Sequence, residues 1–378
     1  MLKIGILGVG QAGGNIAELA YTHGFVTGAI NFRKDLESLE KIKNKYAIPK
    51  GFGAGKNRDI GISSVKEYYS DMLRFVEEKF IDVDILYVAS SLGGGTGSGT
   101  APILIDLLIG TMSCPVGAII ILPDTTEDFT AQSNTSIALA EITNLEGLAT
   151  TFIIDNEKAR NSKPGLSKKE LYDYANKYMI EGLVAVNNAT TMNSNLSNFD
   201  PEDLKSILST GGFTIISHCN LTEPMMELNA KQVAEQIMNS WDKTVFPNIS
   251  YGKIQKAGMI YHMGLELIDR INHDLIFRET GKPLTVYTGY YPKGTGTIIS
   301  ILSGMEYPFE RFNALDTIIE ENKDSIEKSV TKNRGYESRG GDWYKQTTSK
   351  KAVNSGTDPG SKENQKLSLI EKMKKYGN

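Results

Sequence analysis

The sequence predicts an α/β protein built around a Rossmann-like parallel sheet. Three short segments are predicted to be buried strands: 2–7, which is apolar apart from Lys3, and the continuously apolar runs 85–89 and 116–122. Such segments are typical of parallel strands buried on both faces. The first two run directly into glycine-rich turns, and each turn precedes a segment with helical features. A strand, a glycine turn and a helix start, in that order, are the usual phosphate-binding arrangement of α/β proteins.

The rest of the chain adds a central helix, a second domain and a charged end. The central helix is expected to begin at a capping box, in which Ser167 is followed three residues later by Glu170. The second domain, smaller and of the α+β type, is expected from alternating strand-like and helix-like segments. In chain order the expected parts are a nucleotide-binding domain over 1–166, the central helix and a catalytic loop over 167–212, the second domain over 213–307, a C-terminal helix over 308–330 and a flexible basic tail over 331–378.

Composition indicates a globular protein of a reducing compartment. The chain has 378 residues, of which 40% are hydrophobic and 23% charged, enough for two ordinary domains with cores of their own. Its two cysteines lie far apart and its four histidines show no ligand spacing, so we predict no metal site built from protein ligands. The apolar runs are too short to cross a bilayer, and the first ten residues lack the regions of a signal peptide. We therefore expect a cytoplasmic protein with no membrane partner.

The glycine-rich run that follows the apolar segment 85–89 is the strongest functional signal. Glycine lets the backbone fold closely around an anion, and small hydroxyl residues donate hydrogen bonds without bulk. A flexible linker is the alternative, but linkers rarely stand directly between a buried strand and a helix. The residues expected to bind phosphate here are Gly93, Gly94, Gly95, Thr96, Gly97 and Ser98.

Two further glycine loops are predicted to contribute to the same site. Gly8-x-Gly10-x-x-Gly13 matches the dinucleotide fingerprint of a Rossmann oxidoreductase, but the acid expected after the second strand arrives late, as Asp35. No Gly-x-x-x-x-Gly-Lys-Ser/Thr occurs in the chain, which excludes a P-loop enzyme. We therefore expect backbone amides and helix dipoles to hold the phosphates. The residues assigned to nucleotide binding from these loops are Gly10, Gln11, Ala12, Asn15, Gly53, Ala54 and Gly55.

The run Gly-Gly-Gly-Thr-Gly-Ser-Gly at 93–99, together with the loops at 8–15 and 51–57, resembles the signature loops of the tubulin/FtsZ superfamily of GTPases. The resemblance covers roughly residues 1–305. It implies the tubulin/FtsZ fold, GTP and GDP as ligands, and Mg²⁺ bound to the phosphates with few direct protein ligands. It also implies head-to-tail association into filaments.

Four residues inherit roles in nucleoside recognition from this resemblance. Glu127, in a Pro-x-x-x-Glu segment, is expected to contact the ribose, although the family has an arginine four residues later, where this chain has Ala131. Asn156 and Asn176 are expected to contact guanine, and the Tyr172 ring to stack on it; helical spacing places Tyr172 and Asn176 on one face. A solvated loop acid is the alternative for Glu127, and a packing role is the alternative for Tyr172.

The segment Asn198-x-Asp200-x-x-Asp203 matches the catalytic loop of the same superfamily at equal spacing. Carboxylates suit phosphoryl transfer to water, because the attacking water needs a base or an orienting group. In the family these acids complete the active site of the next subunit. A structural role is compatible with this, since Asp200 before Pro201 makes a good helix N-cap.

The charge distribution predicts a partner for the tail. Residues 328–378 hold twelve Lys or Arg and five Asp or Glu, a net +7 in a chain whose total is −4, so the body is acidic and the end basic. A basic tail resembles that of the plasmid- and phage-borne TubZ group, in which it engages a centromere-binding adaptor on DNA. A solvated tail without a partner is the alternative.

Together these features predict a tubulin-like GTPase that polymerises head-to-tail into cytoplasmic filaments and segregates plasmid or phage DNA. An FtsZ-type division filament is the first alternative, but the acidic, apolar terminal peptide of that group is absent from this sequence. A Rossmann oxidoreductase leaves the run at 93–99 unexplained. A structural or DNA-binding protein that keeps nucleotide without turnover is disfavoured by the Asp200 and Asp203 pair.

Overall fold

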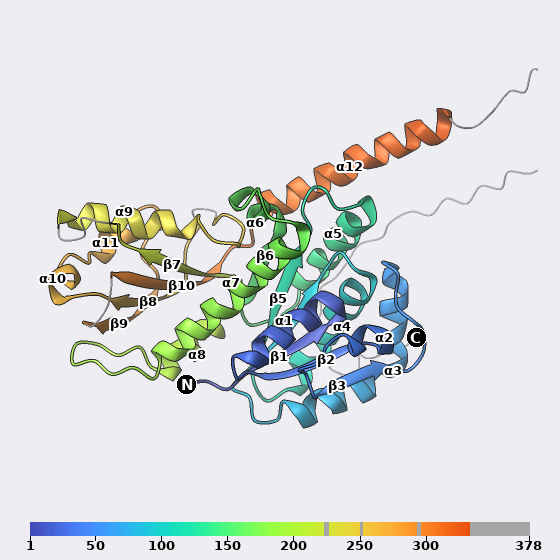
Figure 1. Cartoon of the computed structure of the whole chain (residues 1–378), viewed down its shortest axis with the longest axis horizontal. Helices are drawn as coiled ribbons and strands as arrows, with labels where there is room; N and C mark the ends of the chain where they lie inside the picture. The colour runs from blue at the N-terminus through green and yellow to red at the C-terminus, as the bar shows by residue number, and fades with distance from the viewer. Residues whose placement is uncertain (223–226, 250–251, 293–295, 333–378) are drawn as a thin grey trace, which may run out of the picture.

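A computed structural model describes residues 1–222, 227–249, 252–292 and 296–332, and its elements form one elongated molecule (Figure 1). The basic tail lies outside the described residues, apart from its first two positions. The strands are β1 (Ile4–Val9), β2 (Val26–Phe32), β3 (Lys45–Ile48), β4 (Ile85–Ser91), β5 (Val116–Leu122), β6 (Thr151–Asp155), β7 (Phe213–Asn220), β8 (Lys256–His262), β9 (Thr285–Tyr291) and β10 (Thr297–Met305). The helices are α1 (Gly10–Thr22), α2 (Arg33–Glu37), α3 (Arg58–Lys79), α4 (Gly95–Thr111), α5 (Phe129–Thr143), α6 (Asn156–Ser162), α7 (Lys168–Ala189), α8 (Pro201–Leu208), α9 (Ala230–Trp241), α10 (Leu265–Ile268), α11 (His273–Ile276) and α12 (Phe309–Lys332).

A single ten-stranded sheet connects the two halves of the molecule, in the order β3-β2-β1-β4-β5-β6-β7-β10-β8-β9. Strands β3 to β7 are parallel, and the pairing of β6 with β7 joins the first half to the second. Beyond β7 the sheet is mixed, since β10 lies antiparallel to both β7 and β8. The predicted α/β class with a parallel sheet is confirmed.

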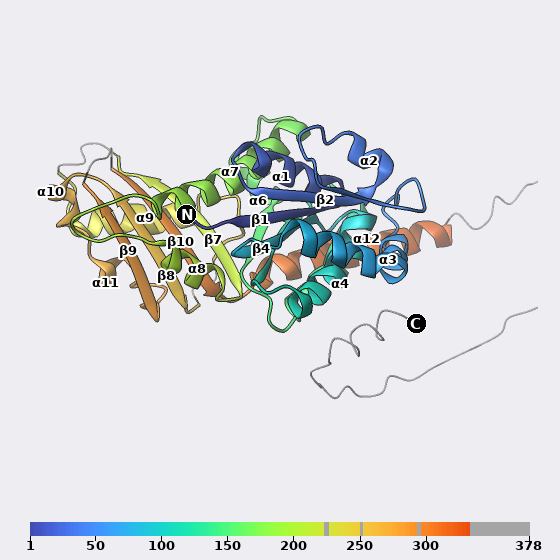
Figure 2. The same cartoon turned by 90° about the horizontal axis from the view of Figure 1, so that it is seen from below.

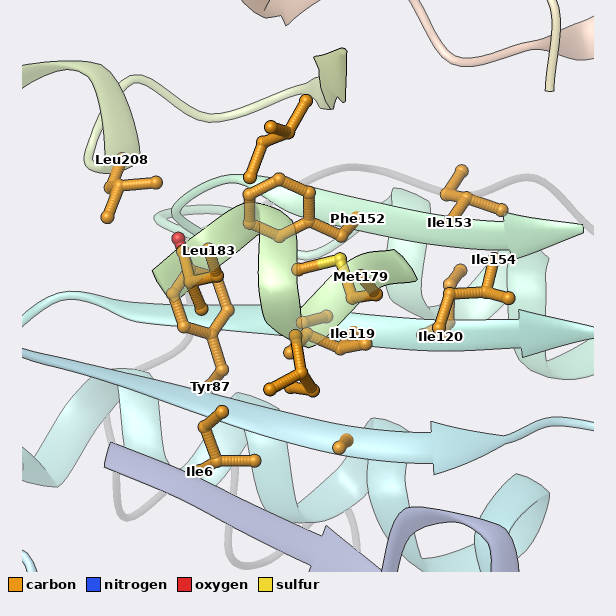
Figure 3. Packing of buried hydrophobic residues seen from close by; sticks show 14 of the residues in the cluster. Ile6, Tyr87, Ile119, Ile120, Phe152, Ile153, Ile154, Met179, Leu183 and Leu208 are labelled. Atoms are coloured by element: carbon orange, nitrogen blue, oxygen red, sulfur yellow. The ribbon is translucent and has the colours of Figure 1, made fainter. Parts of the chain in front are cut away.

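Helices cover both faces of the parallel half, with α1 and α7 on one face and α3 and α4 on the other (Figure 2). The central helix α7 packs on the sheet through Met179 and Leu183, which lie above the side chains of β4 to β6 (Figure 3). The Tyr87 ring lies 5.6 Å from the Phe152 ring, and the Tyr87 hydroxyl donates to the Thr150 hydroxyl, which donates to the Leu208 carbonyl. These contacts hold β4, β6 and the end of α8 together in the core.

One helix expected in the second half is replaced by two shorter helices. The apolar pattern of residues 268–278 suggests a single helix, but the structure has two short helices, α10 and α11, on either side of Asp269–Asn272. Asn272 accepts a hydrogen bond from the Leu275 amide and so begins a new helix at His273. The local cap outweighs the periodicity.

The C-terminal helix α12 runs along α5 and projects beyond the body of the molecule (Figure 1). Near its start Arg311 is bonded to the first half, and one turn and a half later Asp316 accepts from the Ser136 hydroxyl of α5 at 2.6 Å. Within the described residues, no helix is both long enough and apolar enough to cross a membrane.

Candidate nucleotide-binding site

A cavity of about 300 Å³ opens where the carboxyl ends of β1 and β4 meet the starts of α1 and α4. Its size suits a small polar ligand. The lining residues in the described chain include no lysine or arginine, and one of them, Asp35, is acidic. They are Val9, Gly10, Gln11, Ala12, Asp35, Gly53, Ala54, Gly55, Ser91, Gly94, Gly95, Thr96 and Gly97.

Helices α1 and α4 both begin at this cavity without a side-chain cap. Val9 and Gly94 precede them, neither supplies a side-chain acceptor, and neither helix has an acid in its first turn. By contrast, α3, α5, α7, α8 and α9 are each capped by a side chain, from Asn57, Asp128, Ser167, Asp200 and Asn229 in turn. The amides and partial positive charges of α1 and α4 are therefore available to an anion.

Two glycines let these helix starts pack directly on the backbone of β4. A Cβ atom at Gly13 would lie 2.0 Å from the Ala89 carbonyl oxygen, and one at Gly97 would lie 2.3 Å from the Ser91 carbonyl oxygen. Any side chain at either position would push its helix away from the strand. The two amide-bearing helix starts are thus held at a fixed separation.

Helix α5 holds two of the glycine loops together. The Asn134 side-chain amide donates to the Lys56 carbonyl at 2.8 Å and to the Gly93 carbonyl at 3.3 Å. Lys56 also forms an ion pair with Asp128, and the Lys56 hydrogen bond keeps the pKa of Asp128 below its usual range. The loop at 51–57 is therefore fixed against the loop at 93–95.

The segment 123–128, which carries Glu127, is held from two neighbouring helices. The Tyr172 hydroxyl of α7 donates to Glu127 Oε1 at 3.1 Å. From α6, Arg160 donates to the buried Asp124 carboxylate at 2.6 Å, and Glu157 accepts from the Thr125 amide at 2.8 Å. Glu127 is thus tied to Tyr172, the residue with which it is predicted to share a nucleoside.

Asn156 and Asn176 lie on helices that adjoin this segment. Asn156 is buried and is the first residue of α6, which Asp155 caps. Asn176 is half-buried on α7, one turn after Tyr172. The Lys168 ammonium lies 5.6 Å from the centroid of the Tyr172 ring, a distance at which a cation stabilises the ring electrostatically.

Asp200 and Asp203 form the capping box of α8. The Asp203 amide donates to Asp200 Oδ1 at 2.9 Å, and the Asp200 amide donates to Asp203 Oδ2 at 3.1 Å. Burial raises the pKa of Asp203, against the lowering effect of the hydrogen bond from the Asp200 amide. The structural role expected for Asp200 is confirmed, and each carboxylate retains one oxygen outside the box.

These two acids lie far from the cavity. Tyr172 is near the start of the 22-residue helix α7, whereas α8 follows the loop at its other end. At 1.5 Å per residue, α7 is about 33 Å long. Asp200 and Asp203 therefore do not reach a ligand in the cavity of their own chain.

The predicted residues that line the cavity are Gly10, Gln11, Ala12, Gly53, Ala54, Gly55, Gly94, Gly95, Thr96 and Gly97. Others stand apart from its lining: Asn15 is exposed, Gly93 packs on Ala131, and the Ser98 hydroxyl donates within its own helix to the Gly94 carbonyl. Glu127, Asn156, Tyr172 and Asn176 are also outside the lining.

The sequence reasoning missed several residues that shape the site. It did not assign Val9, Asp35 or Ser91 to the cavity, nor Asn134 and Arg160 to the surrounding network. Asp35 alone has a sequence signal, as the acid that arrives late after the second strand. Asn134 and Arg160 act through partners 34 to 78 positions away, so no local motif marks them.

Comparisons with known proteins agree with this geometry. Residues 3–163 match the family model of the Tubulin/FtsZ family, GTPase domain. The Cell division protein FtsZ 1 of Pyrococcus horikoshii is 28% identical over 246 residues, which cover 63% of this chain and 63% of that protein. The Tubulin-like protein TubZ of Clostridium botulinum C phage is 24% identical over 337 residues, covering 84% and 83%. A GTPγS-form protofilament structure of TubZ from Bacillus thuringiensis serovar israelensis has a TM-score of 0.75 at 19% identity, covering 87% of this chain and 94% of that one.

The chain thus spans less than two thirds of the length of the FtsZ 1 relative and more than four fifths of the phage TubZ. Residues 3–163 thus match the GTPase-domain model of the Tubulin/FtsZ family, and the chain has the fold of the TubZ structures. The resemblance on which the expected fold rests is confirmed.

Proposed function

We propose that this protein binds GTP in the cavity between α1 and α4 and hydrolyses it in head-to-tail filaments of its own copies. The observation that carries the proposal is the separation of two half-sites along α7. The cavity has uncapped helix starts for phosphate but lacks a second acid, whereas Asp200 and Asp203 lie at the start of α8, beyond the far end of α7. A second copy whose α8 meets this cavity would complete the site. Such a heterologous contact does not close on itself, so it generates filaments.

In this mechanism the α1 and α4 amides hold the phosphates without help from a lysine or arginine side chain of the cavity lining. Glu127 hydrogen-bonds the ribose, Asn156 and Asn176 the guanine edge, and Tyr172 stacks on the base. Asp200 and Asp203 of the next copy orient the attacking water, and geometry supplies most of the rate increase. Mg²⁺ would neutralise charge on the phosphates, and Asp35, the carboxylate of the cavity lining, would be the residue to hold waters of that ion.

We further propose that the filament segregates plasmid or phage DNA, with the basic tail engaging a centromere-binding adaptor. Two observations support this role over that of a division filament. The match to the phage TubZ spans 84% of the chain, against 63% for the division protein FtsZ 1. The net charge of the segment 328–378 is +7, which suits a partner that is itself bound to DNA.

Mixing two inactive variants tests the shared active site. A Cβ at Gly94 meets no atom within 4 Å, so Gly94→Asp should fold normally and repel phosphate from the cavity. Asp200→Asn keeps a good N-cap for α8 but loses the charge. We expect each variant alone to release phosphate from GTP at less than about a hundredth of the unmodified rate.

The mixture should regain activity, because an intact cavity of the Asp200→Asn chain can meet the intact acids of the Gly94→Asp chain. Gly94→Ala is the matched control and should remain active. A site complete within one chain predicts that the mixture stays inactive and that the unmodified chain hydrolyses GTP at the same rate per molecule at every dilution; either result would reject the proposal.

A further inference from the structure

Arg311 of the C-terminal helix is bonded to two segments of the first half of the molecule. Its Nε donates to Asp155 Oδ2 at 2.9 Å, and its Nη2 donates to the Pro123 carbonyl at 2.8 Å. The arginine side chain is 13% exposed and the aspartate side chain 4% exposed. The planar guanidinium therefore fixes two acceptors at once, in surroundings that water barely reaches.

Asp155 stands directly before, and Pro123 four residues before, a residue predicted to contact the nucleoside. Asp155 caps α6 by accepting from the Glu157 amide at 3.1 Å, and the residue after it is Asn156. Pro123 follows β5 and begins the segment that leads to Glu127. One side chain thus joins the carboxyl ends of β5 and β6 at the points where the base and ribose contacts begin.

The surroundings give these segments room to move if Arg311 is lost. A second cavity, of about 350 Å³, lies beside the pair and is lined in part by Asp155, Lys158, Pro308 and Arg311. Loss of the guanidinium would leave the Asp155 carboxylate buried without its cation, which favours rearrangement toward the water in this cavity. Burial already raises the pKa of Asp155, and Arg311 opposes that effect.

We propose that Arg311 is a positioning residue for guanosine, through which α12 forms part of the wall that holds Asn156 and Glu127. The proposal rests on the proposed binding of guanine nucleotides. It places the selectivity for the nucleoside under the control of α12, while the phosphate grip of α1 and α4 is independent of that helix.

Binding of GDP and of inorganic pyrophosphate separates these two parts of the site. Both affinities are measured by calorimetry on the full chain, diluted below the concentration at which it assembles. Loss of an outer group that orients a ligand-contacting residue costs about ten- to a hundredfold in affinity at metal sites. We expect Arg311→Met to weaken GDP binding by about tenfold and to reduce the preference for GDP over ADP, with pyrophosphate binding unchanged.

Two further variants sharpen the test. Arg311→Lys keeps the charge but not the two-pronged geometry and should give an intermediate loss of GDP affinity. Asp316→Asn weakens the other bond of α12, to Ser136, without touching Pro123 or Asp155, and should change neither affinity.

The outcomes distinguish this proposal from the one on which it rests. If the unmodified chain binds pyrophosphate but not GDP, guanine-nucleotide binding itself is wrong. If the unmodified chain binds GDP and both Arg311 variants bind it equally well, the positioning role is wrong. It is also wrong if both variants lose GDP and pyrophosphate in equal proportion, because that is the result of a general structural defect.

Discussion

At the scale of single residues, the hydrogen bond from Tyr172 to Glu127 joins the residue proposed to stack on the base to the residue proposed to contact the ribose. Burial, and after it the charge of Glu127, raises the pKa of the Tyr172 hydroxyl above its ordinary value. The hydroxyl therefore keeps its proton at neutral pH and donates a hydrogen bond to Glu127. Tyr172→Phe keeps the ring and releases Glu127. We expect GDP affinity to fall by about tenfold, because a hydrogen bond to a charged carboxylate contributes roughly 1.5 kcal/mol, and the preference for GDP over 2′-deoxy-GDP to disappear.

Competition of the two nucleotides for the purified chain measures this effect. Tyr172→Ala should lose stacking as well and bind both nucleotides weakly. Tyr174→Phe is the matched control: it removes a hydroxyl from the same helix, and its ring lies near Lys163 instead of Glu127. An undiminished preference for the ribose form in Tyr172→Phe would separate Glu127 from sugar recognition.

At the scale of elements, helix α6 carries a lysine whose charge opposes folding. Lys158 donates to Asn248 Oδ1 at 2.7 Å, and burial lowers its pKa to about 8. The unfolded chain keeps that amine protonated up to about pH 10.4. Between these values the unfolded state binds more protons, so stability increases with pH.

Lys158→Met should remove this pH dependence. At pH 7 it should raise the free energy of unfolding by up to about 3 kcal/mol, reduced by the contribution of the lost hydrogen bond to Asn248. Urea unfolding at pH 7 and pH 9.5 measures the difference in free energy of unfolding between the variant and the unmodified chain. This difference should be smaller at pH 9.5. Lys169→Met, on the exposed surface of α7, should show no such trend. An advantage that grew with pH would contradict the assignment.

The elements that sequence patterns predict well are those whose cause is local. Gly13 and Gly97, in the first turns of α1 and α4, contact β4 so closely that no side chain fits, and this requirement is visible in the sequence as glycine-rich runs. Asn134, Arg160 and Arg311 are ordinary helical residues until folding brings their acceptors to them. The wrong helix at residues 268–278 has the same origin, because Asn272 acts through a cap and not through apolar spacing.

At the scale of the whole molecule, one continuous sheet joins the two halves, and the 22-residue helix α7 leads from Tyr172 to the loop before the acids of α8. The segment before residue 328 carries a net charge of −11, against +7 for the remainder. A filament of such copies would carry one basic tail per subunit along an acidic folded body. Many weak tail contacts would then act together on a partner with repeated sites, as they do in multivalent binding.

A chain that ends at Lys332 keeps all of α12 and tests this division of roles. We expect it to hydrolyse GTP and assemble at the unmodified rate, because the cavity, Arg311 and the acids of α8 are all retained. Its sedimentation with adaptor-bound DNA should be lost. Binding of the full chain should weaken steeply with salt, since the tail contacts are ionic.

A full-length variant with Lys and Arg of 333–378 changed to Gln separates charge from length and should behave as the truncated chain does. If the truncated chain bound as tightly as the full chain, with the same salt dependence, the partner would have to be held by the folded body instead.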